Sequence, residues 1–230
     1  MSDTQPFVPA LLNAAGLNLQ AVFAVADLPP ALRQPLAAFG DYRQLILIGH
    51  GGRAMWQALR RAGLDVADPI DTFSRRVTEQ WLAEQLPGGR YALLYPGSPG
   101  VSLQALGELA GWHHPSPFMV GINATWGSWF AYRALVLADS DFAPTAARRE
   151  VAPCSACAGR DCVAACPAGA LDGGYFALDK CIAWRRQPAS SCRMGCPARL
   201  ACPVAGEHRY SGEQMRHSYA ISLRMIEQYT

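Results

Sequence analysis

The first 153 residues of this 230-residue sequence contain no cysteine, and the whole chain lacks a long apolar run. A bilayer-spanning helix needs about 20 apolar residues, so we expect no membrane partner. Neither a G-x-S-x-G nor a Walker sequence is present, so nothing indicates a serine-hydrolase elbow or a P-loop. Neither sign of charge predominates. The formal net charge is only +2, which gives no reason to expect nucleic acid as a partner.

The N-terminus lacks the basic segment that opens a secretory signal, so we expect a cytoplasmic protein. Half of the residues are hydrophobic and 17% are charged. This composition supplies a folded core and excludes a disordered chain.

The positions of the cysteines divide the chain into two parts. All eight cysteines lie between Cys154 and Cys202. The formal charge changes at nearly the same place, from −1 over residues 1–150 (11 basic, 12 acidic) to +3 over residues 151–230 (9 basic, 6 acidic). We therefore expect a first domain over residues 1–148, a small cysteine-bearing domain over 149–205, and a C-terminal helix over 206–230 that packs back on the body.

The first domain mixes helical and extended patterns without a regular βαβ period, so the predicted fold class is α+β. Helices are expected over residues 7–15, 30–38, about 53–61, 101–110 and 212–230. A further helix is expected to begin with Asp71 as its N-cap. Strands are expected at 19–26, 45–48, 91–95 and 129–139.

The cysteine spacing is typical of iron–sulfur proteins. A first run reads C-x2-C-x4-C-x3-C-P, and a second set ends in another Cys-Pro pair. In two-cluster ferredoxins the cysteine before proline serves the other cluster. Zinc sites commonly use two C-x2-C pairs, and only one is present here. Zinc and disulfides remain the alternatives to a pair of 4Fe–4S clusters.

If the cysteine of each Cys-Pro pair binds the other cluster, as in two-cluster ferredoxins, all eight thiols are assigned to two sets of four ligands. The first predicted cluster has the ligands Cys154, Cys157, Cys162 and Cys202. The second has the ligands Cys166, Cys181, Cys192 and Cys196. Five arginines lie near these ligands in sequence, namely Arg160, Arg185, Arg186, Arg193 and Arg199. They either raise the cluster potentials and dock an acidic electron donor, or form a solvated basic face.

A stretch before the cysteines resembles a known family. It contains Gly111-Trp112-His113-His114, then Asn123, then Gly127-Ser128-Trp129-Phe130. This resembles the "GW…N…GSWF" stretch of epoxyqueuosine reductases, and Cys181-Ile182-Ala183-Trp184 resembles their "CISY". In that family a cobalamin-binding domain precedes two 4Fe–4S clusters, so the resemblance implies this arrangement here.

The N-terminal half also resembles the cobalamin-processing proteins of the CblC type, in the 45–48 strand, the 68–71 helix start and the 127–133 strand. Both families have a modified nitroreductase-like fold, so the resemblance implies this fold for the first domain. We expect a ferredoxin-like domain to follow it. The resemblance implies that cobalamin contacts Trp112, His113, Gly127, Ser128, Trp129 and Phe130. Flavin mononucleotide is the alternative cofactor. A dinucleotide fingerprint at Gly49–Ala54 is a further alternative.

One departure concerns the proton donor. Epoxyqueuosine reductases carry an aspartate in a stretch that corresponds here to residues 94–99, which contain no carboxylate. We therefore do not expect a true epoxyqueuosine reductase. Tyr95, His113 and His114 are the candidates for a replacement proton donor, although packing roles account for them equally well.

The predicted function is transfer of electrons from two 4Fe–4S clusters to bound cobalamin, for reductive cobalamin processing or a cobalamin-dependent reduction. A flavodoxin or a ferredoxin-reductase type of protein is the expected electron donor. The alternatives are an epoxyqueuosine reductase-like tRNA-modifying enzyme, a carrier that keeps cobalamin reduced for delivery, and a ferredoxin-type electron carrier without cobalamin.

Overall fold

The computed structural model describes residues 4–98, 100–146 and 151–229. The chain forms two compact units. The first comprises Met1–His113 and Phe130–Arg149, and the second comprises His114–Trp129 and Glu150–Thr230. The segment 114–129 thus belongs to the cysteine-bearing unit and not to the first, and the predicted domain boundaries stay a prediction.

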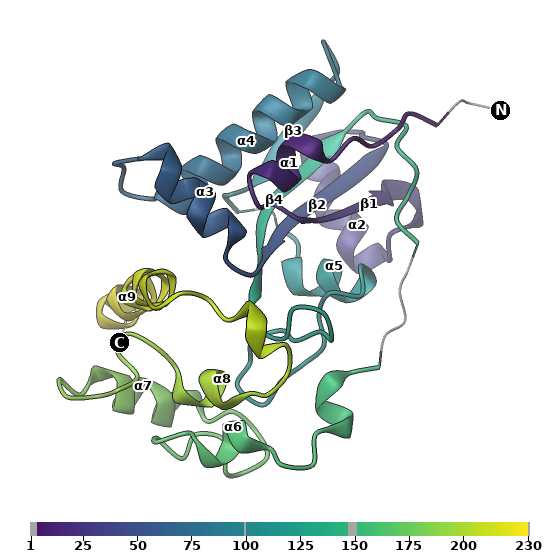
Figure 1. The fold of residues 1–230 in the computed structure, drawn as a ribbon. Helices are drawn as coiled ribbons and strands as arrows, with labels where there is room; N and C mark the ends of the chain where they lie inside the picture. Colours follow the sequence, from purple (N-terminus) through teal and green to yellow (C-terminus); the bar gives the residue numbers. More distant parts are fainter. Residues whose placement is uncertain (1–3, 99, 147–150, 230) are drawn as a thin grey trace. The chain divides into compact units, whose positions relative to one another are not determined.

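The first unit is built on a four-stranded antiparallel sheet in the order β1-β2-β4-β3 (Figure 1). Its strands are β1 (Leu19–Ala24), β2 (Gln44–Gly51), β3 (Tyr91–Tyr95) and β4 (Phe130–Ala138). All of β2 is buried, as expected for a central strand covered on both faces. Because β2 is antiparallel to both neighbours, the Gly49–Ala54 motif does not lie in the parallel βαβ unit that a dinucleotide fingerprint requires.

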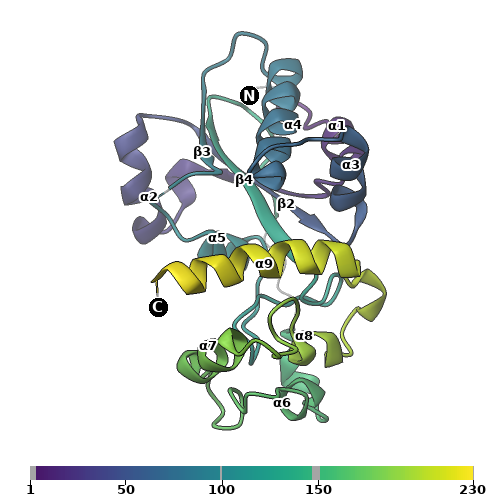
Figure 2. The ribbon, with the colours of Figure 1, turned by 90° about the vertical axis from the view of Figure 1, so that its left-hand side faces the viewer.

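Helices cover both faces of this sheet (Figure 2). The helices of the first unit are α1 (Ala10–Ala14), α2 (Pro30–Leu36), α3 (Ala54–Ala62), α4 (Pro69–Gln85) and α5 (Leu103–Leu109). Alternate residues of the strands divide between two cores. Ile46 and Val136 pack with α1, α3 and α4, whereas Leu47 and Leu135 pack with α2 and α5. The largest side chain of the first core, Trp81, is fully buried and contacts Phe7 and Phe142.

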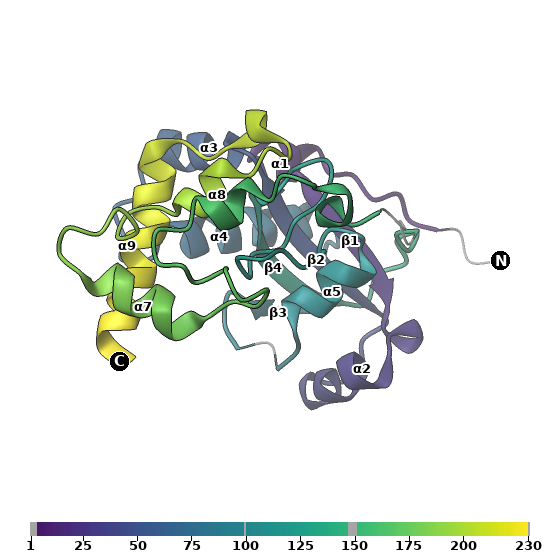
Figure 3. The same cartoon turned by 90° about the horizontal axis from the view of Figure 1, so that it is seen from below.

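The second unit consists of short helices, loops and one long helix (Figure 3). Its α-helices are α6 (Asp161–Ala164), α7 (Leu178–Arg186), α8 (Pro197–Ala201) and α9 (Gly212–Tyr229). Its own core includes Phe118 and Ile122 from the preceding segment, together with Leu171, Ala198 and several cysteines. No helix in the described ranges is long and apolar enough to cross a bilayer.

Two predicted details are wrong. The helix expected to start with Asp71 as N-cap starts at Pro69 after Asp68, and Asp71 lies in its first turn. Proline fits the first turn of a helix, which moves this boundary. The C-terminal helix was expected to pack back on the body with one apolar face that included Met215 and Met225, but Met225 is 49% exposed and the buried apolar residues are Met215 and Leu223.

Candidate functional site

The eight thiols of the second unit gather into two groups of four. The first group is Cys154, Cys157, Cys162 and Cys202, and Cys154 interacts electrostatically with the other three. The second group is Cys166, Cys181, Cys192 and Cys196, and Cys181 interacts electrostatically with the other three. The same two sets of cysteines are the predicted ligands of the two clusters, and their ligation of clusters stays a prediction.

The first group draws on three short segments. Cys154 lies in a 3₁₀ turn (Pro153–Ala156), Cys162 lies in α6, and Cys202 follows the end of α8. Helices α6 and α8 contact each other, which brings the distant Cys202 to the other three thiols. Cys162 and Cys202 are buried, whereas Cys154 and Cys157 are half-buried beside the exposed Arg160.

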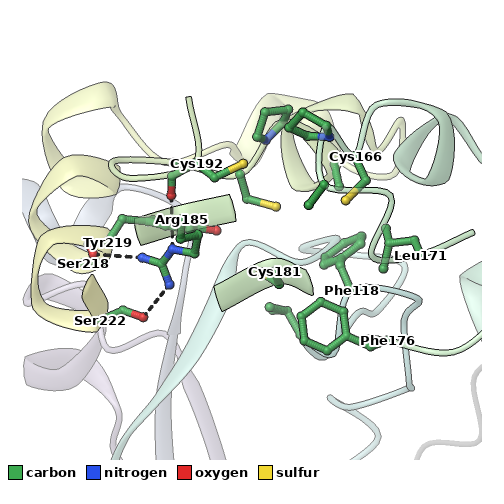
Figure 4. Close-up of a pocket in the computed structure, with 17 residues that line it drawn as sticks. Phe118, Cys166, Leu171, Phe176, Cys181, Arg185, Cys192, Ser218, Tyr219 and Ser222 are labelled. Carbon is green, nitrogen blue, oxygen red and sulfur yellow. Dashed lines mark hydrogen bonds between the residues drawn. The ribbon is translucent and has the colours of Figure 1, made fainter. Parts of the chain in front are cut away.

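The second group lines a cavity of about 250 Å³. All four of its cysteines face this space, together with Phe118, Leu171 and Phe176 on one side and residues of α9 on another (Figure 4). Cys196 stands at the N-terminus of α8, and its sulfur accepts a hydrogen bond from the Arg199 amide nitrogen at 3.5 Å. The volume exceeds the roughly 10–15 Å³ that a single water needs.

Burial makes these thiols poor acids in the metal-free chain. Desolvation raises the pKa of Cys154 and Cys162 in the first group and of Cys181 and Cys192 in the second, and neighbouring thiols add to the increase. Metal ligation requires the thiolate. Binding of a cation at either group therefore offsets the free-energy cost of deprotonating a buried thiol. All eight cysteines are described, and all are free thiols.

The donor set fits an iron–sulfur cluster at each group, because 4Fe–4S clusters take four cysteine thiolates. Among the described residues, no three histidine, cysteine, aspartate or glutamate side chains lie close enough together to hold one metal ion. Ligands of a four-iron cluster bind different iron atoms and stand farther apart than those of a single ion.

Two buried arginines flank the second group. Arg185 is 8% exposed and donates hydrogen bonds to the carbonyl oxygens of Cys192 (3.1 Å) and Tyr219 (3.1 Å) and to the Ser222 hydroxyl (2.9 Å). Arg199 is also 8% exposed, and its guanidinium lies 4.4 Å from the centre of the Trp129 ring and 5.0 Å from that of Tyr210. Neither arginine forms a salt bridge with a carboxylate in the described part of the chain.

The predicted cofactor residues Gly127, Ser128 and Trp129 contact other residues of the second unit. Ser128 and Trp129 are fully buried, and Arg199 donates hydrogen bonds to both the Ser128 hydroxyl and its carbonyl. Gly127 has a φ of +57° and lies against the carbonyl of Val204. The structure thus explains these residues by packing, and their contact with cobalamin stays a prediction.

The other predicted cofactor residues lie in the first unit, where Trp112 stacks on Tyr132 with ring centres 6.5 Å apart. The Nδ1 atom of His113 lies 3.1 Å from the Tyr132 hydroxyl, and burial raises the pKa of that phenol. Phe130 packs edge-on against the same ring. His113 is therefore held in a buried polar pair, and none of the predicted cofactor residues lines the cavities of the two cysteine groups.

The other two candidate proton donors, His114 and Tyr95, belong to different units. His114 pairs with Ile122 through backbone hydrogen bonds in the second unit. Tyr95 ends β3 in the first unit, and burial raises the pKa of its phenol although the nearby Arg133 lowers it. The Tyr95 phenol therefore keeps its proton at neutral pH. Arg133 also donates a hydrogen bond from Nε to Nδ1 of His50 at 2.9 Å, a polar contact that sequence patterns did not indicate.

No protein-family model matches this sequence, and no curated protein is similar to it. Solved structures are similar. A CblC B12-trafficking protein from C. elegans is 13% identical, with a TM-score of 0.56 over 95% of this chain and 91% of that one. An epoxyqueuosine reductase with a modified tRNA stem loop is 15% identical, with a TM-score of 0.55 over 90% and 68%.

A catabolic reductive dehalogenase in complex with 3-bromo-4-hydroxybenzoic acid is 12% identical, with a TM-score of 0.56 over 95% of this chain and 34% of that one. This chain thus has the fold shared by CblC, epoxyqueuosine reductase and reductive dehalogenase. It spans about two thirds of the length of the epoxyqueuosine reductases that it matches.

Proposed function

We propose that this chain is an iron–sulfur redox protein that holds two 4Fe–4S clusters and binds cobalamin. The observation that carries the proposal is the gathering of eight free thiols into two groups of four. A structural role alone does not require four thiols around one cavity. Bound clusters would supply one-electron transfer, and cobalamin would supply a reducible cobalt centre.

The residues of the chain supply the setting for this chemistry. Apolar side chains such as Phe118 and Phe176 line the second cavity beside its thiols. Arg185 places positive charge beside thiolates that would otherwise repel one another. The similarity of the fold to a B12-trafficking protein supports the cobalamin part of the proposal.

The first test is anaerobic reconstitution with iron and sulfide. We expect about eight irons per chain, as two four-iron clusters require. Addition of one equivalent of cob(II)alamin should then change its electron paramagnetic resonance spectrum to the base-off form, which lacks nitrogen superhyperfine splitting. A chain that takes up zinc but no iron would contradict the cluster part, and an unchanged cobalamin spectrum would contradict the cobalamin part alone.

A second candidate function is reduction of an organic substrate, as in a reductase or dehalogenase of this fold. The specific observation is the Tyr95 phenol, which is half-buried, stays protonated at neutral pH and lies near Arg133. A phenol in this state can donate a proton to a reduced substrate. Substrate-dependent oxidation of the reduced protein that is lost in Tyr95→Phe, with cluster content unchanged, would distinguish this function from cobalamin delivery.

A further inference from the structure

We infer that Arg185 is the counter-charge of the second cysteine group and holds that site at the higher reduction potential of the two. This inference rests on the proposed function, because it assumes that clusters occupy both groups. The sequence left open whether the arginines near the cysteines tune the clusters or form a solvated face. The burial of Arg185 and its place in the lining of the second cavity favour the first reading for this arginine.

The two groups differ in the burial of their neighbouring cations. Arg160, beside the first group, is exposed, so water and salt screen its charge. Arg209, which donates a hydrogen bond to the Cys202 carbonyl of the first group at 3.4 Å, is only half-buried. Arg185, which lines the second cavity, is 8% exposed, and its charge acts through a medium of lower dielectric constant.

Buried charges in proteins are normally paired. The salt bridges of the described residues involve neither Arg185 nor Arg199, and their neighbours are hydroxyls, carbonyls, aromatic rings and thiols. Among these neighbours the thiols are the groups that ligation converts to anions. The second cysteine group, once ligated, is therefore the natural partner of the Arg185 charge.

Arg185 is fixed in place, so its charge cannot swing away to solvent. The three hydrogen bonds of Arg185 join α7 to α9 and to the loop that carries Cys192 (Figure 4). Reduction adds one negative charge to a cluster, and a fixed cation nearby stabilises that charge and raises the potential.

The experiment is a redox titration of the full chain with reconstituted clusters, followed by electron paramagnetic resonance. We expect two one-electron steps in the wild type. Arg185→Gln should make reduction at the upper step at least tenfold less favourable, about 59 mV for one electron, and should leave the lower step in place. Arg185→Lys should keep the upper potential close to wild type.

Arg193→Gln is the matched control, because Arg193 follows Cys192 directly but is partly exposed and paired with Glu227 at 3.4 Å. We expect no shift from it. Equal shifts in Arg185→Gln and Arg193→Gln, or a shift of the lower step, would overturn the inference.

Iron content separates the remaining outcomes. If Arg185→Gln retains only about four irons while Arg185→Lys retains about eight, the charge is needed and the inference stands. Loss of four irons in both variants would show that the hydrogen bonds matter and the charge does not, which overturns it. A wild-type chain without iron would overturn the proposed function, whereas a fully loaded chain with unmoved potentials would overturn this inference alone.

Discussion

Gly127 and Val204 approach each other so closely that a Cβ atom at position 127 would lie 2.3 Å from the Val204 carbonyl oxygen. The backbone of Gly127 also has a φ of +57°. We expect Gly127→Ala to destabilise the second unit by about 2–4 kcal/mol, because it adds a left-handed strain of about 1–2 kcal/mol to a steric clash. Urea unfolding of the apo protein measures the loss.

Gly63→Ala is the control for this substitution. Gly63 has nearly the same φ, +60°, but a Cβ there would meet nothing within 4 Å. It should therefore show the strain without the clash, about 1–2 kcal/mol. Equal losses in the two variants would mean that Val204 does not restrict position 127.

Gly107 lies inside helix α5, where alanine is normally about 1 kcal/mol more favourable than glycine. A Cβ at this position would lie 2.0 Å from the Tyr132 hydroxyl oxygen. We expect Gly107→Ala to destabilise the first unit by about 1–3 kcal/mol despite the gain in helix propensity. The loss should be smaller in a Tyr132→Phe background, and a double-mutant cycle of unfolding free energies measures the coupling. Strictly additive effects would contradict the predicted contact.

The grouping of the cysteines predicts which pairs of substitutions act on the same cluster. Cys154→Ser and Cys202→Ser should each cost about four irons, and the double variant should lose no more than either alone. Cys162→Ser combined with Cys166→Ser should cost about eight, although these residues are only four positions apart. Iron analysis of the reconstituted proteins distinguishes the cases, and a smaller loss in the second pair than in the first would contradict the grouping.

Burial in α9 lowers the pKa of His217, and the nearby Arg224 lowers it further while Glu213 opposes this. The unfolded chain therefore binds a proton at His217 at a higher pH than the folded chain. The contribution of His217 to the free energy of unfolding is fully present above the pKa of the unfolded state, about 6.5. It is lost as the pH falls toward the lower pKa of the folded state. We expect His217→Gln to reduce the loss of stability between pH 7.5 and about 5.5, as measured by urea unfolding. An unchanged slope would contradict the prediction.

Strong local patterns were sufficient to predict most elements of the first unit. The apolar run at 45–48 and the stretch 91–95 are strands, because β-branched and apolar residues between turn signals suit a covered sheet. The start of α4 was misplaced, because Asp71 is a good N-cap but Pro69 two residues earlier fits the first turn as well. Such competition between two start signals is decided by packing, which sequence patterns do not contain.

Sequence patterns predict only part of the candidate site as well. The spacing of the cysteines predicts two sets of four thiols, because the Cys-Pro and C-x2-C patterns can be read directly from the sequence. The burial of Arg185 depends on Tyr219 and Ser222, more than 30 residues away in α9, so its sequence neighbourhood resembles that of the exposed Arg186. Phe118, from the segment before β4, lines the second cavity without any local signal that would place it there.

The second unit is discontinuous in sequence, because residues 114–129 precede β4 and the cysteine segment follows it. During synthesis, Ser128 and Trp129 leave the ribosome some 70 residues before Arg199, their partner, has been made. The cysteine segment cannot therefore be excised as a self-sufficient C-terminal fragment. A fragment that starts after β4 would lack Phe118 and Ile122, which belong to the core of this unit.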